Sequence, residues 1–261
     1  MEKYLPPKRA ARGALRTALS SLAAAALPGS AAAVPFWLRL PEGVSTYSGK
    51  LDGLFSLILW ITGVIFVIVE ILLLFFLLRY RHKEGRVPKY THGSSRLEVI
   101  WTIIPAIICV VLALLSRRVW ADIKQTMPPG AMTVEVMAEQ FAWNIRYPGA
   151  DGKFETADDV VSLNQLHFPV GRPVVLILRS KDVIHSFFLP EFRVKQDAVP
   201  GMTTRIWLEA TRVGNWEIAC AELCGLGHYR MKGFVTVDTP EDFDRWLAEQ
   251  AADSEEAAKS S

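Results

Sequence analysis

Two long apolar runs constrain the fold of this chain more than any other feature of its sequence. Residues 54–78 hold a single charged side chain, Glu70, and residues 97–116 form a second run that contains Pro105. About 20 predominantly apolar residues are enough to cross the hydrocarbon core of a bilayer, and a proline is tolerated inside such a helix. The runs therefore predict a hairpin of two transmembrane helices, within a membrane anchor that covers residues 34–118.

The charges around these runs predict how the hairpin is oriented. The connecting residues 79–96 carry six Lys or Arg and one acid, Glu84. Short basic loops stay in the cytoplasm, so both ends of the chain should lie outside. Residues 1–118 carry 15 basic and 6 acidic side chains, or +9, whereas residues 119–261 carry 14 and 21, or −7. We expect an anchor in membrane lipid, in a bacterial inner (plasma) membrane, with the acidic half exported to the periplasmic side.

The first 33 residues have the three-part pattern of an export signal. Basic residues from Lys8 to Arg16 precede an Ala/Leu-rich stretch at 17–28 and three alanines at 31–33. The apolar stretch is weak, so two interpretations stay open for residues 1–33: a cleaved signal peptide, or a flexible arm.

From about residue 131 the pattern changes to short strands. Segments rich in β-branched and aromatic residues alternate with Gly, Pro and Asp, and no long helical segment intervenes. This pattern predicts an all-β sandwich or barrel over residues 119–240. Residues 241–261 are predicted to form a short helix and a disordered tail. The strand candidates are residues 132–137, 174–178, 205–208, 216–219 and 233–237.

One twelve-residue segment concentrates metal-binding side chains. Between Cys220 and Met231 lie two thiols, the imidazole of His228 and a thioether. Sulfur with imidazole selects copper, zinc or iron–sulfur, but methionine is a poor zinc ligand, and zinc sites show Cys/His pairs at two-residue spacing. A single copper needs only one thiolate, so two thiolates four residues apart can instead bridge two metals.

A disulfide between Cys220 and Cys224, in an oxidising compartment, is the alternative to a metal site. A disulfide requires neither His228 nor Met231, and their presence at these offsets favours metal. The third cysteine, Cys109, lies in the second apolar run and is predicted to be inert packing. Because no Cys-x-x-Cys-His occurs, no c-type haem is covalently attached to this chain.

A further histidine ligand should come from elsewhere in the chain. His82 and His92 lie in the predicted cytoplasmic loop, and His167 resembles a packed strand residue. His185 lies at the end of a predicted strand and enters a loop, which is where a cupredoxin supplies its first histidine ligand. His185 is therefore the candidate.

Four segments resemble, in the right order, subunit II of haem–copper cytochrome c oxidases. They cover about residues 50–240, and the copper signature is the most specific of them. The resemblance implies a cupredoxin-like Greek-key sandwich or barrel that follows the two-helix anchor. The segments are C-A-E-L-C-G-L-G-H-Y-R-M at 220–231, D-V-I-H-S-F at 182–187, V-K-Q-D-A-V-P-G-M at 194–202 and L-E-V-I-W-T-I-I-P-A-I-I at 97–108.

The resemblance also implies a dinuclear copper centre of the CuA type. The two thiolates would bridge both copper ions. His185 and Met231 would complete one ion, and His228 with the main-chain carbonyl of Glu222 would complete the other. The Glu222 carboxylate would ligate a Mg²⁺ shared with subunit I. The implied metal ligands are His185, Cys220, Glu222, Cys224, His228 and Met231.

The implied function is that of subunit II of an aa3-like cytochrome c oxidase. The chain would accept electrons from cytochrome c and pass them to haem in subunit I, where O2 is reduced to water with proton pumping. Its partners would be subunit I, subunit III and cytochrome c, and no nucleic acid is expected. Quinol oxidase subunits lack the copper ligands, and nitrous-oxide reductase needs a large propeller domain. A membrane-tethered copper electron-transfer protein without an oxidase partner stays open as the alternative.

Three further residues are candidates for electron or proton transfer. In the family, the position of Glu98 lies at the entrance of a proton pathway into subunit I. The family's aromatic cluster Gln-Trp-Tyr-Trp corresponds here to residues 140–143, Gln-Phe-Ala-Trp. Phe141 therefore stands where the family has the tryptophan that receives the incoming electron, and Trp143 can serve instead. If both lie on one strand, their side chains share a face.

Overall fold

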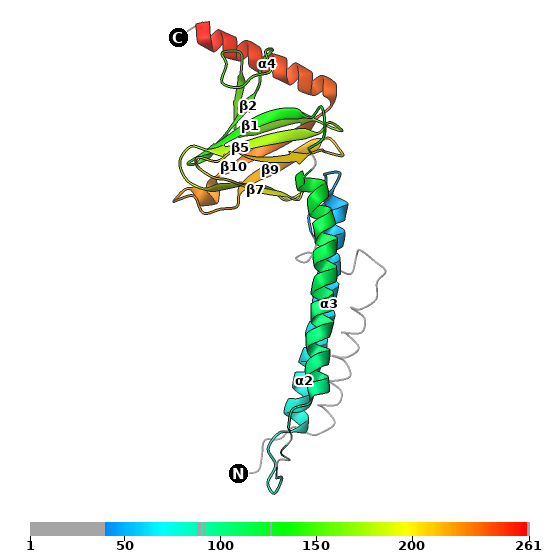
Figure 1. The fold of residues 1–261 in the computed structure, drawn as a ribbon. Helices are drawn as coiled ribbons and strands as arrows, with labels where there is room; N and C mark the ends of the chain where they lie inside the picture. The colour runs from blue at the N-terminus through cyan, green and yellow to red at the C-terminus, as the bar shows by residue number, and fades with distance from the viewer. Residues whose placement is uncertain (1–39, 88–89, 91, 126, 260–261) are drawn as a thin grey trace, which may run out of the picture. The chain divides into compact units, whose positions relative to one another are not determined.

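The computed structural model describes residues 40–87, 90, 92–125 and 127–259. The predicted export signal or arm, residues 1–33, lies outside the described residues. Two antiparallel helices, α2 (Ser48–Arg79) and α3 (Ser95–Trp120), pack side by side and are followed by a short π-helical segment, η3 (Ala121–Gln125) (Figure 1). Both helices are long and apolar enough to cross a membrane, judged by length and composition.

The helices extend beyond the predicted apolar runs at both ends. Glu98 lies in the first turn of α3, and Arg117 with Arg118 lies in its last turn, which suits the helix dipole at each end. Pro105 lies within α3 without ending it. The apolar side chains that face away from the hairpin are exposed in this chain, as expected for a surface that contacts lipid or another membrane subunit.

Residues from Met132 to Asp238 form a sandwich of two five-stranded sheets (Figure 1). The first sheet has the order β3-β2-β1-β5-β8 and the second β4-β10-β9-β6-β7. The strands of the sandwich are β1 (Met132–Glu139), β2 (Ala142–Tyr147), β3 (Val160–Leu163), β4 (Gln165–Pro169), β5 (Val174–Ser180), β6 (His185–Leu189), β7 (Val194–Ala198), β8 (Thr204–Leu208), β9 (Gly214–Cys220) and β10 (Lys232–Asp238).

Strand pairing joins segments that are far apart in the sequence. β1 pairs in parallel with β5, and β4 pairs in parallel with β10, while the other neighbours are antiparallel. The predicted all-β sandwich is confirmed. Buried apolar side chains alternate along the strands, as Trp143, Ile145 and Tyr147 do on β2, and fill the space between the sheets. Each large apolar side chain buried in this way stabilises the fold by about 1.5–3 kcal/mol.

Direct contacts tie the membrane anchor to the sandwich. Ser45, just before α2, forms an isolated β-bridge with Ala210. The Asp52 carboxylate, in the first turns of α2, accepts hydrogen bonds from the guanidinium of Arg193 at 2.7 and 3.0 Å. These contacts fix the start of α2 against the sandwich, next to the first residue of β7.

The C-terminal helix α4 (Pro240–Lys259) is longer than predicted. Phe243 is buried, and the Trp246 ring stacks on His167 with their ring centres 4.0 Å apart. The residues expected to form a disordered tail continue this helix up to Lys259. The longer helix has a physical cause: alanine and glutamate, which dominate this stretch, are strong helix formers and extend a helix whose first turns are docked.

Candidate metal centre

Two cysteine thiols face each other at the end of the second sheet. Cys220 ends β9 and Cys224 lies in the loop that follows. Their Sγ atoms are 3.8 Å apart, and both side chains are buried and free. A disulfide requires about 2.05 Å between the sulfur atoms, so the thiols are adjacent but not bonded.

Each thiol has an imidazole beside it. The Nδ1 atom of His185 lies 3.9 Å from the sulfur of Cys220, and the Nδ1 atom of His228 lies 3.6 Å from the sulfur of Cys224. His185 is the first residue of β6, immediately after the β5–β6 loop, and not the last residue of a strand as predicted. His167, which was predicted to be a packed strand residue, lies on β4, where its Nδ1 is 2.9 Å from Asp238.

The thioether and one carbonyl complete the cluster. The Met231 sulfur lies 3.6 Å from the sulfur of Cys224, and the Cys220 thiol donates to the carbonyl of Glu222 at 3.3 Å. All six predicted ligands thus meet in one place, with three sulfur atoms, two imidazole nitrogens and one carbonyl oxygen. This soft donor set fits copper and is a poor match for zinc, which rarely accepts a thioether.

Burial changes the acidity of the Cys224 thiol. Desolvation, together with the neighbouring Cys220 thiol, raises the pKa of Cys224 to about 11. The Cys224 thiol is therefore protonated at neutral pH while no metal is bound, and a metal ion must displace that proton to gain a thiolate ligand.

Two glycines allow an aromatic ring to cover the segment between β9 and β10, residues 221–231, which we call the metal loop. A Cβ atom at Gly227 would lie 2.5 Å from the Phe141 ring, and one at Gly225 would lie 2.7 Å from the amide nitrogen of Gln140. Gly225 also has a φ of +134°, which a residue with a side chain rarely adopts. Close approach of residues 140–141 to the loop thus requires glycine at both positions.

The sequence matches two family models over most of its length. The transmembrane domain of cytochrome c oxidase subunit II matches residues 33–119, and the periplasmic domain of the same subunit matches residues 132–237.

The chain belongs to the cytochrome c oxidase subunit II family.

One similar relative is the alternative cytochrome c oxidase subunit 2 of Bradyrhizobium diazoefficiens, which is 37% identical over 240 residues and covers 83% of this chain and 84% of the relative. Another is the cytochrome c oxidase subunit 2 of Cereibacter sphaeroides, which is 34% identical over 239 residues and covers 80% of this chain and 77% of the relative. A crystal structure of the periplasmic domain of subunit II from Bradyrhizobium japonicum is 28% identical, with a TM-score of 0.42, and covers 49% of this chain and 99% of its own.

Membership of the subunit II family defines where the parts of this chain lie. The two apolar helices anchor it in the membrane, and the cupredoxin-like sandwich with the cysteine cluster is periplasmic. The family's periplasmic domain implies CuA copper at the cluster, and subunit II implies a partner oxidase subunit. The predicted family, fold and orientation are therefore confirmed.

In this subunit II chain, Asp182 and Gln140 hold three segments of the metal centre together. One Asp182 oxygen lies 2.9 Å from Nε2 of His185, and the other accepts the backbone N–H of Gln140 at 2.7 Å. The Gln140 side chain donates to the carbonyl of Cys224. Burial opposes ionisation of Asp182, but hydrogen bonds from His185 and from two backbone N–H groups outweigh it and lower its pKa. The carboxylate is therefore ionised and orients the imidazole.

The aromatic candidates occupy different environments. Trp143, on β2, is fully buried, and its ring centre lies 6.1 Å from that of His185 in an edge-on arrangement. Within the described part of the chain, no group accepts a hydrogen bond from its Nε1. Phe141 is half-buried and lies in the turn before β2, so the two residues do not share a strand as the sequence allowed.

We expect Asp182→Ala to weaken copper binding by roughly 10- to 100-fold, because ligand orientation by hydrogen-bonded partners typically has effects of that size. Competition with a copper chelator at neutral pH measures the loss. Asp253→Ala, which removes an exposed carboxylate from α4, is the matched control and should leave affinity unchanged. Equal affinities for the Asp182→Ala variant and the wild type would show that His185 keeps its orientation without this contact.

Proposed function

We propose that this chain is the electron-accepting subunit of an aa3-like cytochrome c oxidase. It takes electrons from cytochrome c at a dinuclear copper centre and delivers them to haem in subunit I, for reduction of O2 to water coupled to proton pumping. The observation that carries the proposal is the pair of unbonded thiols 3.8 Å apart, flanked by two imidazoles and a thioether, in a periplasmic domain with a membrane anchor.

The residues around the cluster suit rapid electron transfer. When bound, two copper ions bridged by Cys220 and Cys224 would supply a one-electron carrier whose charge is shared over both metals. The protein contributes rigidity to the site. Asp182 orients His185, and Gln140 links the metal loop to the turn between β1 and β2. Phe141 and the buried wall of the sandwich exclude water from one side of the site. Fixed ligands of this kind change little when the charge of the centre changes.

Glu222 is suited to serve two sites at once. Its carbonyl lies at the Cys220 thiol, while its side chain is exposed. Carboxylates are the protein ligands that Mg²⁺ prefers. We propose that the Glu222 carboxylate ligates a Mg²⁺ at the contact with subunit I, so that one residue links the copper loop to the partner.

Glu98 is proposed to lie at the entrance of a proton pathway into subunit I. It is exposed in the first turn of α3, at the cytoplasmic end of the membrane anchor. An ionisable group at the edge of a membrane span is often functional. Subunit III is expected as a further partner of the same complex.

For electron uptake we favour Trp143 over Phe141. An indole is easier to oxidise than a phenyl ring, and the Trp143 ring meets the ring of the ligand His185 edge-on. Phe141 covers the glycines of the metal loop, where a packing role accounts for its contacts.

The charge of the periplasmic part favours a basic cytochrome c as donor. Residues 119–261 carry a net charge of −7. Residues 240–261 contribute −5 of it, because they hold seven acidic side chains and only two basic ones, Arg245 and Lys259. Attraction would therefore act mainly through α4, and would weaken as salt screens it.

A membrane-tethered copper protein without an oxidase partner is the alternative. Affinity purification of the tagged chain from its native membrane separates the two, and we expect haem to co-purify in a fixed ratio to copper. A control chain, in which residues 1–118 are replaced by an unrelated two-helix anchor, should hold copper and lose the haem. Copper without haem in the native chain would favour the alternative.

A further inference from the structure

Two arginines lie on the side of the membrane where basic residues are least expected. Arg117 and Arg118 directly follow the apolar run that ends at Ser116, and the periplasmic domain begins a few residues later. Lys and Arg accumulate on the cytoplasmic side of membrane helices, so cations at the periplasmic end call for a physical reason. Among the residues that the structure describes, no side chain pairs with either guanidinium.

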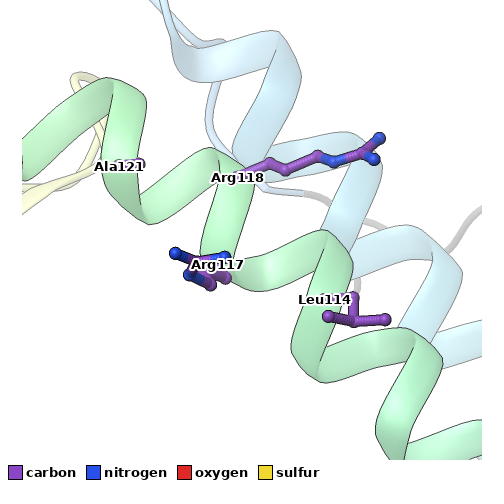
Figure 2. Close-up of a pocket in the computed structure, with 4 residues that line it drawn as sticks. All are labelled: Leu114, Arg117, Arg118 and Ala121. Carbon is purple, nitrogen blue, oxygen red and sulfur yellow. The ribbon is translucent and has the colours of Figure 1, made fainter.

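A hollow opens beside these arginines where α2 and α3 meet the sandwich. This junction pocket has a volume of about 550 Å³, and its wall combines apolar and basic side chains, among them Leu51, Leu54, Ala113, Arg117, Trp120 and Lys124. A second hollow of about 360 Å³ lies against the same part of α3 and also includes Arg117. Figure 2 shows its lining residues, with Arg117 and Arg118 extending in different directions from the helix.

The α3 wall of the junction pocket changes from apolar to basic along one helix face. Ala113, Arg117, Trp120 and Lys124 are spaced by four, three and four residues, so they form a single stripe. Arg117 and Lys124 are about 10 Å apart along the axis. The polar zone on each side of a bilayer is roughly 5–8 Å thick, and this part of the stripe therefore spans it.

The end of the stripe nearest the sandwich, formed by Trp120 and Lys124, has the composition of a surface that contacts lipid headgroups. Trp120 is half exposed, as aromatic residues at the membrane surface are. The Lys124 ammonium lies 5.9 Å from the centre of that ring and donates to the side chain of Gln196 at 2.6 Å. A cation held in this way keeps two more donors for an anion.

We propose that the junction pocket binds one anionic phospholipid of the periplasmic leaflet. Its phosphate contacts Arg117 and Lys124, and an acyl chain lies along Leu51, Leu54 and Ala113. Charge complementarity selects the anion, since an arginine fork matches a phosphate group. The apolar wall selects a lipid over a soluble anion, because a free phosphate gains nothing from that surface.

The test uses the full-length, copper-loaded chain in detergent, titrated with phosphatidylglycerol or with phosphatidylcholine of the same acyl chains, and read by native mass spectrometry. The wild type should prefer phosphatidylglycerol. Removing both proposed phosphate contacts (Arg117→Gln with Lys124→Gln) should weaken phosphatidylglycerol binding by about fivefold per cation, with a much smaller change for phosphatidylcholine. The control, Lys153→Gln with Arg245→Gln, loses the same charge from exposed positions of the sandwich and α4 and should behave as wild type.

A second variant tests the apolar wall without touching the charges. Ala113→Trp fills part of the pocket from an exposed helix position and should also reduce lipid binding, at unchanged copper content. No preference for phosphatidylglycerol in the wild type, an equal loss in the charge control, or full competition by inorganic phosphate would each overturn the proposal. So would a partner oxidase subunit that cross-links to Arg117 and leaves no lipid at the pocket.

Discussion

Replacing Cys220 with serine should remove the dinuclear centre. We expect copper bound to the purified chain to fall from roughly two ions to one or none, and the purple colour of a thiolate-bridged pair to disappear, because a single thiolate cannot bridge two soft metal ions. Cys224→Ser should act in the same way, since its sulfur lies equally at the centre of the cluster, between the sulfur of Cys220 and that of Met231. Metal analysis with electron paramagnetic resonance measures both.

The chain contains its own control for this experiment. Cys109 is exposed on α3, within the membrane span and outside the cluster, so Cys109→Ser makes the same chemical change without touching a ligand. It should keep the copper content and spectrum of the wild type. Undiminished copper in Cys220→Ser, or one copper in the wild type, would contradict a bridged pair.

Trp143→Phe should slow reduction of the copper centre by cytochrome c by about tenfold, which corresponds to about 1.4 kcal/mol of activation free energy. The indole ring meets the ring of His185, a proposed copper ligand, edge-on, and it is easier to oxidise than the phenyl ring that replaces it. Phe141→Leu should leave the rate close to that of the wild type. Rapid mixing with reduced cytochrome c measures the rate, on samples with matched copper content and melting temperature.

Packing effects must be separated from electron transfer in this experiment, because Trp143→Phe also leaves space in the core. Trp207→Phe is the control. Trp207 lies on β8 against Tyr47, away from the cluster, and its Nε1 is also buried and without a partner among the described residues. It should cost stability without changing the rate. If Phe141→Leu slows reduction and Trp143→Phe does not, electron uptake occurs at the position where the family has tryptophan.

That the side chains of the cluster meet could be predicted from sequence, because most of them lie close together in the chain. Five of the six come from residues 220–231, and only His185 is contributed by another strand. The supporting contacts could not be predicted in the same way. Gln140 meets Asp182 across 42 residues and Cys224 across 84, and these hydrogen bonds exist only once the turn before β2 and the β5–β6 loop have folded against the metal loop.

Strand prediction succeeded where apolar residues dominate. β1, β5, β8, β9 and β10 were anticipated to within a few residues, whereas β2, β3, β4, β6 and β7 were not. β7 contains Lys195, Gln196 and Asp197, whose polarity hides the strand, and its pairing with β6 depends on contacts made after the chain has folded back. At the C-terminus, composition alone suggested disorder, but docking of Phe243 and Trp246 on the sandwich gives α4 its start.

The 3.8 Å separation of the two thiols has a consequence for biogenesis. The sulfur atoms of the two cysteines are less than 2 Å farther apart than in a disulfide, and the domain lies in an oxidising compartment. Oxygen or a thiol-oxidising enzyme could therefore join them in a disulfide before copper arrives. A cross-linked chain would have lost both bridging ligands. We therefore expect maturation of this subunit to depend on a thiol reductant acting outside the cytoplasm, and on copper delivery that keeps pace with export.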